Sequence, residues 1–524
     1  VPPFKLHKKH IVIPVVDPDK AARFFPGAKT AETSAGHVCA IPHTLDATQL
    51  LRNKGFDVPS PIVSDYDWPG RWTPLPHQKE TSSFLTLNHR CFCLSSMGTM
   101  KTASSIWAAD YMMRTGQAHR CLIVSPLSTL ERVWMDELFN TIPRRSAVVL
   151  HGTRARRREL LEQKHDFYII NHDGVQIIVD MLAKRPDIDL VILDEGATYR
   201  NQRTRKWKMM NTVLNKQNIP RACWEMTGTP TPKSPLDAYG QMKLVKPENY
   251  RGYFTSFRDE VMFQVNQFTW LPKKHAPERA GELLSPSIRY TLEDCVDLPP
   301  TIRQNRTCEL SSQQRAHYKE LMDEAATLVG ESQVTAVNAA VLVNKLIQVA
   351  CGVVYGVDKE ALEINFSPRL KLLKEIIDEC NEKIIIFVPL TGALSALKRE
   401  LSKQWSVEVV EGATPKGKRN KIFQSFQNNI EPRILLANAG TMAHGLTLTA
   451  ASTIIWYAPT NSNEIYTQAN ARIARPGQTK ITNIIHLHST PGEARTYKAL
   501  EEQTKMQSVV LEMARKGNGH EKLG

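Results

Sequence analysis

Short apolar runs that alternate with longer amphipathic stretches constrain the fold of this chain more than any other feature of its sequence. Such runs are typical of strands buried on both faces of a sheet, and the stretches between them have the length and period of helices. The runs are Arg120–Ser125, Asp166–Asn171, Asp189–Asp194 and Cys223–Thr227, then Lys383–Val388, Ser406–Val410, Arg433–Ala437, Ser452–Trp456 and Thr482–Leu487. Strands alternating with helices form βαβ units, so the sequence predicts an α/β protein with two doubly wound parallel-sheet lobes in tandem.

The spacing of these runs divides the 524 residues into five segments. Residues 61–240 and 366–492 contain the two lobes. Residues 1–60 predict a small α+β module that ends in a proline-rich link. Residues 241–365 lack the alternation and carry many prolines and charges, so we expect a helical connector that leads into lobe two. Residues 493–524 predict a charged helix or tail.

The composition narrows the class of partner. A formal net charge of +14 favours a polyanion, because Lys and Arg displace the counterions around phosphates, although a protein can be basic without binding nucleic acid. The nine cysteines lack zinc-ligand spacing, a usage that suits a reducing cytoplasm. No apolar stretch reaches the roughly 18 residues of a membrane span, so we expect no membrane partner.

A strand, a tight turn and a helix follow one another near the start of the first lobe. The strand is Arg90–Leu94, the turn is Met97-Gly98-Thr99-Met100, and an apolar-periodic helix covers Ala103–Met113. Backbone N–H groups of such a turn and of the helix N-terminus point at phosphate oxygens. The pattern therefore predicts a phosphate-binding loop.

Two side chains at the start of that helix suit chemistry on ATP. Lys101 would neutralise charge on the β- and γ-phosphates, and Thr102 would bind Mg²⁺ through its hydroxyl. Met100 stands where phosphate loops usually carry glycine, so this turn must accept a side chain. The alternative is an ordinary helix N-terminus capped by Thr99 or a neighbour.

Two adjacent acids, Asp194 and Glu195, end one of the buried strands. Ligands of open α/β sheets bind at the carboxyl ends of the strands. We expect Asp194 to hold the Mg²⁺ and Glu195 to orient and polarise the attacking water. Adjacent acids can also cap a helix N-terminus, but a phosphate loop earlier in the same lobe favours the catalytic interpretation.

From Leu75 to Gln478 the order of motifs resembles that of the superfamily-two helicases, and among them the Swi/Snf family of DNA translocases. The matching elements are Leu75-Pro76-His77-Gln78, Asp194-Glu195-Gly196-Ala197, Thr227-Gly228-Thr229-Pro230, Met442–Leu448 and Gln468–Gln478. The last is similar to the family pattern Q-x-x-x-R-x-x-R-x-G-Q. The resemblance implies that both lobes are of the recombinase (RecA-like) type, with ATP between them.

The resemblance also implies roles for single residues. Gln78 would read the adenine edge, and Gly445 would belong to the nucleotide site. The residues that would couple the state of ATP to the DNA track are Thr227, Gly228, Thr229 and Gln468. Ala197 stands where the family's acid box usually carries histidine, which weakens the expected link between hydrolysis and Thr227–Thr229.

Two arginines of the last motif complete the predicted catalytic set. Arg472 and Arg475 are three residues apart, so on a helix they would share a face and reach the γ-phosphate from lobe two. A planar, permanently charged guanidinium suits the charge that spreads over a transferring phosphoryl group. The alternative is a solvated basic face.

Residues of the N-terminal segment carry a second resemblance. Ala22–Lys29 and His37–Pro42 are similar to the small HARP-like recognition modules attached to annealing-type members of the family. The alternative is a family-specific N-terminal decoration.

The sequence therefore predicts an ATP- and Mg²⁺-dependent motor on duplex or branched DNA, acting in replication, repair or recombination by fork or branch remodelling, annealing or protein displacement. The compact build suggests a bacterial or phage protein of the host cytoplasm or nucleoid, for which a monomer is plausible. Basic residues expected to contact DNA are Arg154, Arg156, Arg157, Arg158, Arg200, Arg203, Arg205, Lys206 and Lys208. A strand-separating DNA or RNA helicase is one alternative. A weakened ATPase that serves as a nucleic-acid-binding clamp is another, suggested by Met100 and Ala197.

Overall fold

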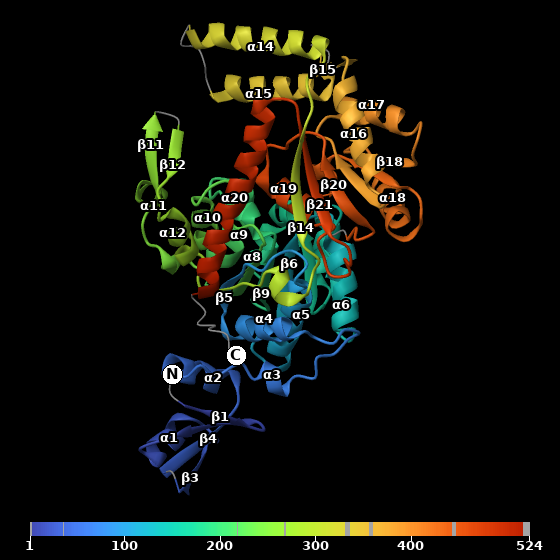
Figure 1. The fold of residues 1–524 in the computed structure, drawn as a ribbon. Coiled ribbons are helices and arrows are strands. Elements are labelled where there is room, and N and C mark those ends of the chain that lie inside the picture. Colours follow the sequence, from blue (N-terminus) through green and yellow to red (C-terminus); the bar gives the residue numbers. More distant parts are fainter. Residues whose placement is uncertain are drawn as a thin grey trace. The chain divides into compact units, whose positions relative to one another are not determined.

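The computed structural model describes residues 3–34, 36–216, 218–266, 269–330, 336–355, 360–442 and 447–516. These residues group into two compact units, the first formed by 1–261, 274–291 and the residues from 509 on, the second by 262–273 and 292–508. Lobe one lies in the first unit and lobe two in the second (Figure 1). No helix among the described residues has the length and apolar character that crossing a membrane requires.

The N-terminal module is a small α+β structure. Its antiparallel sheet has the order β1-β2-β4-β3, and its strands and helices are β1 (Lys5–His7), β2 (His10–Pro14), α1 (Pro18–Phe24), β3 (Lys29–Thr33), β4 (Gly36–Pro42) and α2 (Leu45–Asn53). Asp17 and Thr44 begin the two helices by accepting backbone N–H groups. A core built around Ile11 and Ile41 holds the sheet against the helices.

A short link joins this module to lobe one. It contains α3 (Ile62–Asp65) and ends before α4 (Pro76–Leu87). The backbone N–H of Ser60 donates to Ser83 Oγ at 3.1 Å, and the Ser60 hydroxyl lies 2.7 Å from that of Thr86. Both partners lie on α4, so the end of the module is bonded directly to the first helix of the lobe.

Lobe one is a seven-stranded, fully parallel sheet with the order β13-β5-β10-β9-β6-β8-β7. In that order the strands are Ser287–Ile288, Arg90–Cys93, Ala222–Met226, Ile188–Asp194, Arg120–Ser125, Phe167–Asn171 and Ala147–Val149. The helices around the sheet are α5 (Lys101–Arg114), α6 (Asp136–Thr141), α7 (Arg154–Glu162), α8 (Val179–Ala183), α9 (Arg205–Asn215) and α10 (Asp237–Val245). The predicted parallel α/β lobe is confirmed.

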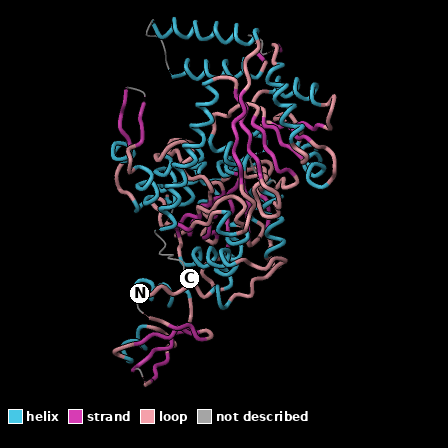
Figure 2. Tube along the Cα trace, viewed as in Figure 1, coloured by secondary structure: helices cyan, strands magenta, loops and turns pink. Residues whose placement is uncertain are grey.

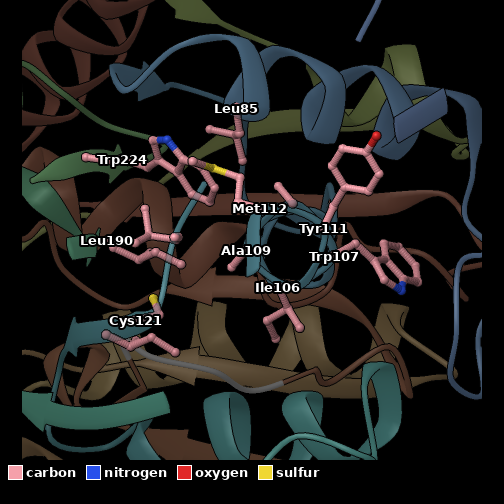
Figure 3. Close-up of a cluster of buried hydrophobic side chains, with 14 of the residues drawn as sticks. Leu85, Ile106, Trp107, Ala109, Tyr111, Met112, Cys121, Leu190 and Trp224 are labelled. Atoms are coloured by element: carbon pink, nitrogen blue, oxygen red, sulfur yellow. The ribbon is translucent and has the colours of Figure 1, made fainter. Parts of the chain in front are cut away.

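The core of lobe one forms where α5 packs against the sheet. Figure 3 shows Met112 and Ala109 of α5 on the side of Trp224 and Leu190 of the sheet, and Ile106 of the same helix belongs to the same cluster. All five side chains are buried. Burying one such large apolar side chain contributes about 1.5–3 kcal/mol, so this interface fixes where α5 begins relative to the strand ends.

Lobe two is a second fully parallel sheet, with six strands in the order β14-β21-β20-β17-β19-β18 (Figure 2). In that order the strands are Thr301–Thr307, Thr482–His488, Ala451–Trp456, Lys383–Phe387, Ile434–Ala437 and Val407–Val410. Ile384 and Ile386 of β17 face one apolar cluster, with α16 (Ser367–Glu379) and α17 (Thr391–Leu401). Ile385 and Phe387 face another, with α18 (Lys416–Asn428), α19 (Asn463–Asn470) and α20 (Pro491–Lys516). Both sheet faces are covered, as predicted for a doubly wound lobe.

The segment expected to be a helical connector also supplies one edge strand to each sheet. β13 pairs with β5 in lobe one, and β14 pairs with β21 along seven residues in lobe two. Its further elements are α11 (Phe254–Val261), β11 (Met262–Asn266), β12 (Thr269–Pro272), α12 (Ala276–Leu283), α13 (Leu292–Cys295), α14 (Ser312–Gly330), α15 (Ala336–Cys351), β15 (Val353–Tyr355) and β16 (Ala361–Glu363). Edge strands bury fewer side chains, so the polar run of β14 lacks the apolar signal of a central strand.

Candidate functional site

Three adjacent parallel strands of lobe one bring the predicted motifs to one edge of the sheet. β5, β10 and β9 are neighbours, and Met226 of β10 lies in register with both Cys93 and Asp194. The predicted phosphate loop, the Thr227–Thr229 segment and the acid pair therefore all begin where these strands end. This edge is where open α/β sheets bind ligands.

The predicted phosphate loop connects β5 to α5, which begins at Lys101. Gly98 and Met100 both have left-handed backbone, with φ of 86° and 56°. Glycine adopts this conformation freely, whereas other residues adopt it at a cost of about 1–2 kcal/mol. Met100 thus keeps the backbone shape that its position in the loop requires, although it is not glycine, and its side chain is 38 % exposed.

The first turn of α4 braces this loop. His77 Nε2 lies 3.1 Å from the carbonyl oxygen of Thr99, and Gln78 Nε2 donates to the carbonyl of Met100 at 3.5 Å. Gln78 Oε1 also accepts the backbone N–H of Leu75 at 2.9 Å. The amide of Gln78 therefore stabilises the loop, and its role in reading adenine stays a prediction.

Asp194 ends β9 beside the phosphate loop. Trp134, in the short helix Leu130–Met135, donates its Nε1–H to Asp194 Oδ2 at 2.9 Å. Burial raises the pKa of Asp194 above its ordinary value, and the Trp134 bond and the charge on Lys101 oppose that rise. Lys101 and Asp194 are thus electrostatic neighbours. Lys101 Nζ also donates to the carbonyl of Ser95 at 3.4 Å.

The second acid opens a tight turn. Glu195 has left-handed backbone with φ of 51° and precedes the short helix η3, Gly196–Tyr199. Its backbone N–H donates to Asp194 Oδ1 at 3.1 Å. Arg200 donates to the carbonyl of Ala197 at 3.1 Å. The acid pair therefore lies on a turn of defined shape, at the end of a buried strand.

Thr227, Gly228 and Thr229 lie against the phosphate loop. The backbone N–H of Thr227 donates to the carbonyl of Cys93 at 3.1 Å, and its hydroxyl accepts the N–H of Thr229 at 3.2 Å. A Cβ added at Gly228 would lie 3.4 Å from the backbone nitrogen of Met97. A change in the conformation of the predicted phosphate loop would therefore directly alter its contacts with this segment.

The oxygen donors at this edge fit Mg²⁺. Thr102, on the first turn of α5, offers a hydroxyl, and Asp194 offers a carboxylate. Mg²⁺ prefers oxygen ligands and is usually held by one or two protein groups together with substrate phosphates. This pair would hold the ion while ATP supplied the remaining oxygens.

The motif residues of lobe two follow or end α19. Gln468 is buried near the end of the helix. The expectation that Arg472 and Arg475 share a helical face is wrong, because α19 ends at Asn470 and both residues lie in the turns that follow. The backbone N–H of Arg475 bonds the carbonyl of Ile473, so the i,i+4 pattern of a helix is absent there.

The turns place the two arginines differently. Arg472 is buried, whereas Arg475 is partly exposed and donates to the carbonyl of Ala471 at 2.7 Å. Burial lowers the pKa of Arg475 to about 10, which still leaves the guanidinium charged at neutral pH. That Arg472 and Arg475 meet the triphosphate bound by lobe one stays a prediction. Gly445 lies outside the described residues.

Three residues of the site had no assigned role in the sequence. His77 braces the phosphate loop, Trp134 holds Asp194, and Glu225 lies buried behind the acid turn. A tryptophan or histidine in a helix gives no sequence signal for such contacts. Glu225 gave one, since an acid in the apolar run Cys223–Thr227 is unusual for a buried strand.

Two family models match this chain, the first over lobe one and most of the connector and the second within lobe two. The chain matches the SNF2-related domain over residues 77–350 and the helicase conserved C-terminal domain over residues 368–477. It is 24 % identical over 404 residues to protein p41 of Acyrthosiphon pisum secondary endosymbiont phage 1, covering 73 % of this chain and 84 % of that protein.

Two further similarities are more distant. The DNA annealing helicase and endonuclease ZRANB3 of Bos taurus is 22 % identical over 427 residues, which are 79 % of this chain but only 38 % of the bovine protein. The solved Sulfolobus solfataricus SWI2/SNF2 ATPase core in complex with double-stranded DNA has a TM-score of 0.40 and 20 % identity, covering 84 % of this chain and 94 % of that one.

Proposed function

The chain belongs to the SNF2-related family, since that domain covers more than half of its residues, and on this premise we propose that it uses ATP to move along double-stranded DNA. Its pairing with a helicase C-terminal domain makes it an ATPase of the helicase type. The proposed setting is DNA replication, repair or recombination. The bovine relative's name, DNA annealing helicase, supports that setting.

One observation carries the ATPase part of the proposal. Lys101, Asp194 and the Thr227–Thr229 segment come together at the carboxyl ends of three neighbouring parallel strands. A cation from a helix N-terminus and a carboxylate from a strand end are what a Mg²⁺-bound triphosphate needs. The loop that would hold the phosphates keeps its left-handed turn despite Met100, which speaks against a decayed site.

Each residue then has a chemical task. Lys101 neutralises the β- and γ-phosphates, and Thr102 with Asp194 would hold the Mg²⁺ that offsets their charge. Glu195 orients the attacking water. Arg475, charged at neutral pH, stabilises the charge of the transition state from lobe two, together with Arg472. Closing of the two lobes on ATP and opening after hydrolysis would advance the grip on DNA.

The structure narrows the basic residues that are available to DNA. Arg157 is buried and donates to two backbone carbonyls, and Arg200 donates to the acid turn. Three others form ion pairs within lobe one: Arg154, Arg156 and Lys206. Four are exposed and form no ion pair with any described residue: Arg158, Arg203, Arg205 and Lys208. The last three lie around the start of α9 and form the proposed phosphate contact.

The deciding experiment is an ATPase panel on duplex, forked, single-stranded and RNA substrates, with Lys101→Ala as the inactive control. Duplex DNA should stimulate turnover most, and Lys101→Ala should abolish it. An ATPase rate that is the same with and without duplex DNA would refute a DNA-driven motor. Stimulation by RNA alone would favour an RNA helicase. A Lys101→Ala variant with full function would mean that the chain works as a clamp.

A second assay tests the proposed DNA contact. Removing Arg203, Arg205 and Lys208 together should weaken duplex binding, and it should lower the slope of log binding constant against log salt by about 0.9 for each phosphate that is no longer neutralised. Arg154→Ala is the matched control, because Arg154 already pairs with Asp180 at 2.7 Å. Equal slopes in both variants would place the DNA elsewhere.

A further inference from the structure

Glu225 is a buried acid in the middle strand of the site. It lies on β10, fully shielded from solvent, between Leu193 of β9 and Phe92 of β5 in the sheet register. Its neighbour Trp224 points into the core shown in Figure 3. Because successive strand residues point to opposite faces, the Glu225 side chain lies on the other face of the sheet.

No described residue hydrogen-bonds to either oxygen of the Glu225 carboxyl. Burial raises its pKa to about 8, so the group is neutral at pH 7. No basic side chain of the described residues contributes to that pKa; the titratable groups that it influences are the Tyr199 phenol and the Cys223 thiol. An apolar side chain would be cheaper here, so packing alone does not account for an acid.

The Glu225 side chain supports the acid turn from beneath. A Cβ added at Gly196 would lie 2.1 Å from Glu225 Cγ and 2.5 Å from its Oε1, so any larger residue at position 196 would collide with it. Gly196 has no left-handed backbone, so it is the space taken by Glu225 that requires glycine there. Gly196 follows Asp194 and Glu195 directly, and Thr227 lies two residues beyond Glu225.

We propose that Glu225 is a positioning residue for ATP hydrolysis: its side chain packs against Gly196, its carboxyl bonds the Gly196–Tyr199 turn in one nucleotide state, and it thereby links the Asp194–Glu195 pair to Thr227–Thr229. The neutral carboxyl can donate one hydrogen bond and accept others. Both oxygens are thus available to backbone groups of the turn when it shifts with the state of the nucleotide. The inference rests on the proposed roles of Asp194 and Glu195.

Two replacements of similar size separate positioning from packing. Glu225→Gln keeps a neutral polar group, and Glu225→Met keeps the volume without hydrogen bonds. Removing a group that orients a metal ligand from its outer shell costs about 10–100-fold in activity. We therefore expect Glu225→Met to lower kcat at least about tenfold with little change in the KM for ATP, and Glu225→Gln to stay within about threefold of the wild type.

The pH profile adds a readout that packing would not move. Wild-type kcat should fall as Glu225 ionises above about pH 8, whereas Glu225→Gln should not show this fall. Cys223→Ala is the matched control, since Cys223 is buried on the same strand and face. It should lower stability without changing kcat or its pH profile. Equal kcat in the Met, Gln and wild-type proteins, or unchanged profiles, would overturn the proposal.

A paired substitution tests the contact itself. Gly196→Ala should lower kcat, because the added methyl meets Glu225 Cγ, and adding Glu225→Ala should restore part of the rate by making space. If the fold loss of kcat in the double variant equals the product of the fold losses in the two single variants, the two residues act independently and the link is refuted. Lys101→Ala separates the two proposals. ATPase activity that survives this substitution would refute the proposed ATP site, whereas failure of the Glu225 tests would refute only the positioning role of Glu225.

Discussion

Replacing Met100 with glycine should stabilise lobe one and leave ATP turnover intact. Met100 has φ of 56°, a conformation that costs an L-residue about 1–2 kcal/mol and glycine almost nothing. Glycine has more conformational freedom to lose on folding, and this entropy cost offsets about 0.5–1 kcal/mol of that gain. The Met100 side chain is 38 % exposed, so the packing of its buried part, which glycine loses, offsets a further part of the gain. We expect a net gain of about 0.5 kcal/mol in the free energy of unfolding.

Two companion variants increase the resolution of this test. Met100→Ala removes most of the side chain but keeps the strained backbone. The free energy of unfolding of the glycine variant should therefore be about 1 kcal/mol higher than that of the alanine variant. Met100→Val adds a β-branched residue, which tolerates left-handed backbone least and should be the least stable of the series. Denaturant unfolding can be followed by fluorescence, because Trp107, Trp134 and Trp224 all lie in the core of lobe one.

The functional readout is the KM for ATP in the same series. Glycine at position 100 leaves the backbone N–H groups of the loop where they are, so the KM should not rise. A glycine variant no more stable than alanine would refute the left-handed conformation. A large loss of ATP binding in the glycine and alanine variants alike would show that the Met100 side chain itself contacts the nucleotide.

Three further predictions follow from single contacts. Trp134→Phe removes the bond that orients Asp194 and should lower kcat about tenfold, measured by steady-state ATPase assays at saturating ATP; an unchanged kcat would contradict that role. Glu225→Gln should flatten the pH dependence of lobe-one stability. Folding raises the pKa of Glu225 from 4.5 to about 8, so between these pH values the carboxyl ionises only in the unfolded wild type. The free energy of unfolding of the wild type should therefore fall with rising pH, by up to about 5 kcal/mol. Denaturation of both proteins at pH 5 and pH 8 checks this, and parallel curves would contradict it. Arg369→Met breaks the buried ion pair with Glu493, whose atoms lie 2.7 Å apart, and should destabilise lobe two by about 3–5 kcal/mol; replacing both residues by apolar ones should cost less, as thermal unfolding would show.

The central strands could be predicted from the sequence because burial on both faces leaves a strong signal. Arg120–Ser125 is a strand with the predicted ends, and the run predicted from Asp189 begins one residue earlier, at Ile188. Of the four edge strands, the run Ser406–Val410 predicts β18, whereas β7, β13 and β14 could not be predicted. Thr301–Thr307 has mostly exposed or half-exposed side chains and pairs with β21 on one side only, so its sequence is polar.

The candidate site divides in the same way. Lys101 and Asp194 could be placed together because one follows and the other ends a predicted strand, and parallel strands end at a common edge; the role of Thr227, which ends a third predicted strand, came from the family resemblance. The conformation around Arg472 and Arg475 could not, because spacing says where two residues would lie on a helix but not that the helix ends at Asn470. Contacts such as Trp134 with Asp194 join segments distant in the chain, and a single sequence carries no record of them.

Helix α4 has a consequence for how the protein can be shortened. Its first turn contacts the predicted phosphate loop through His77, and Ser83 and Thr86 in its last turns hydrogen-bond Ser60. One short helix thus connects the N-terminal module to the predicted phosphate loop. Removing the first sixty residues would take away the Ser60 bonds to α4, so the packing of the N-terminal module and the position of the predicted phosphate loop depend on the same helix.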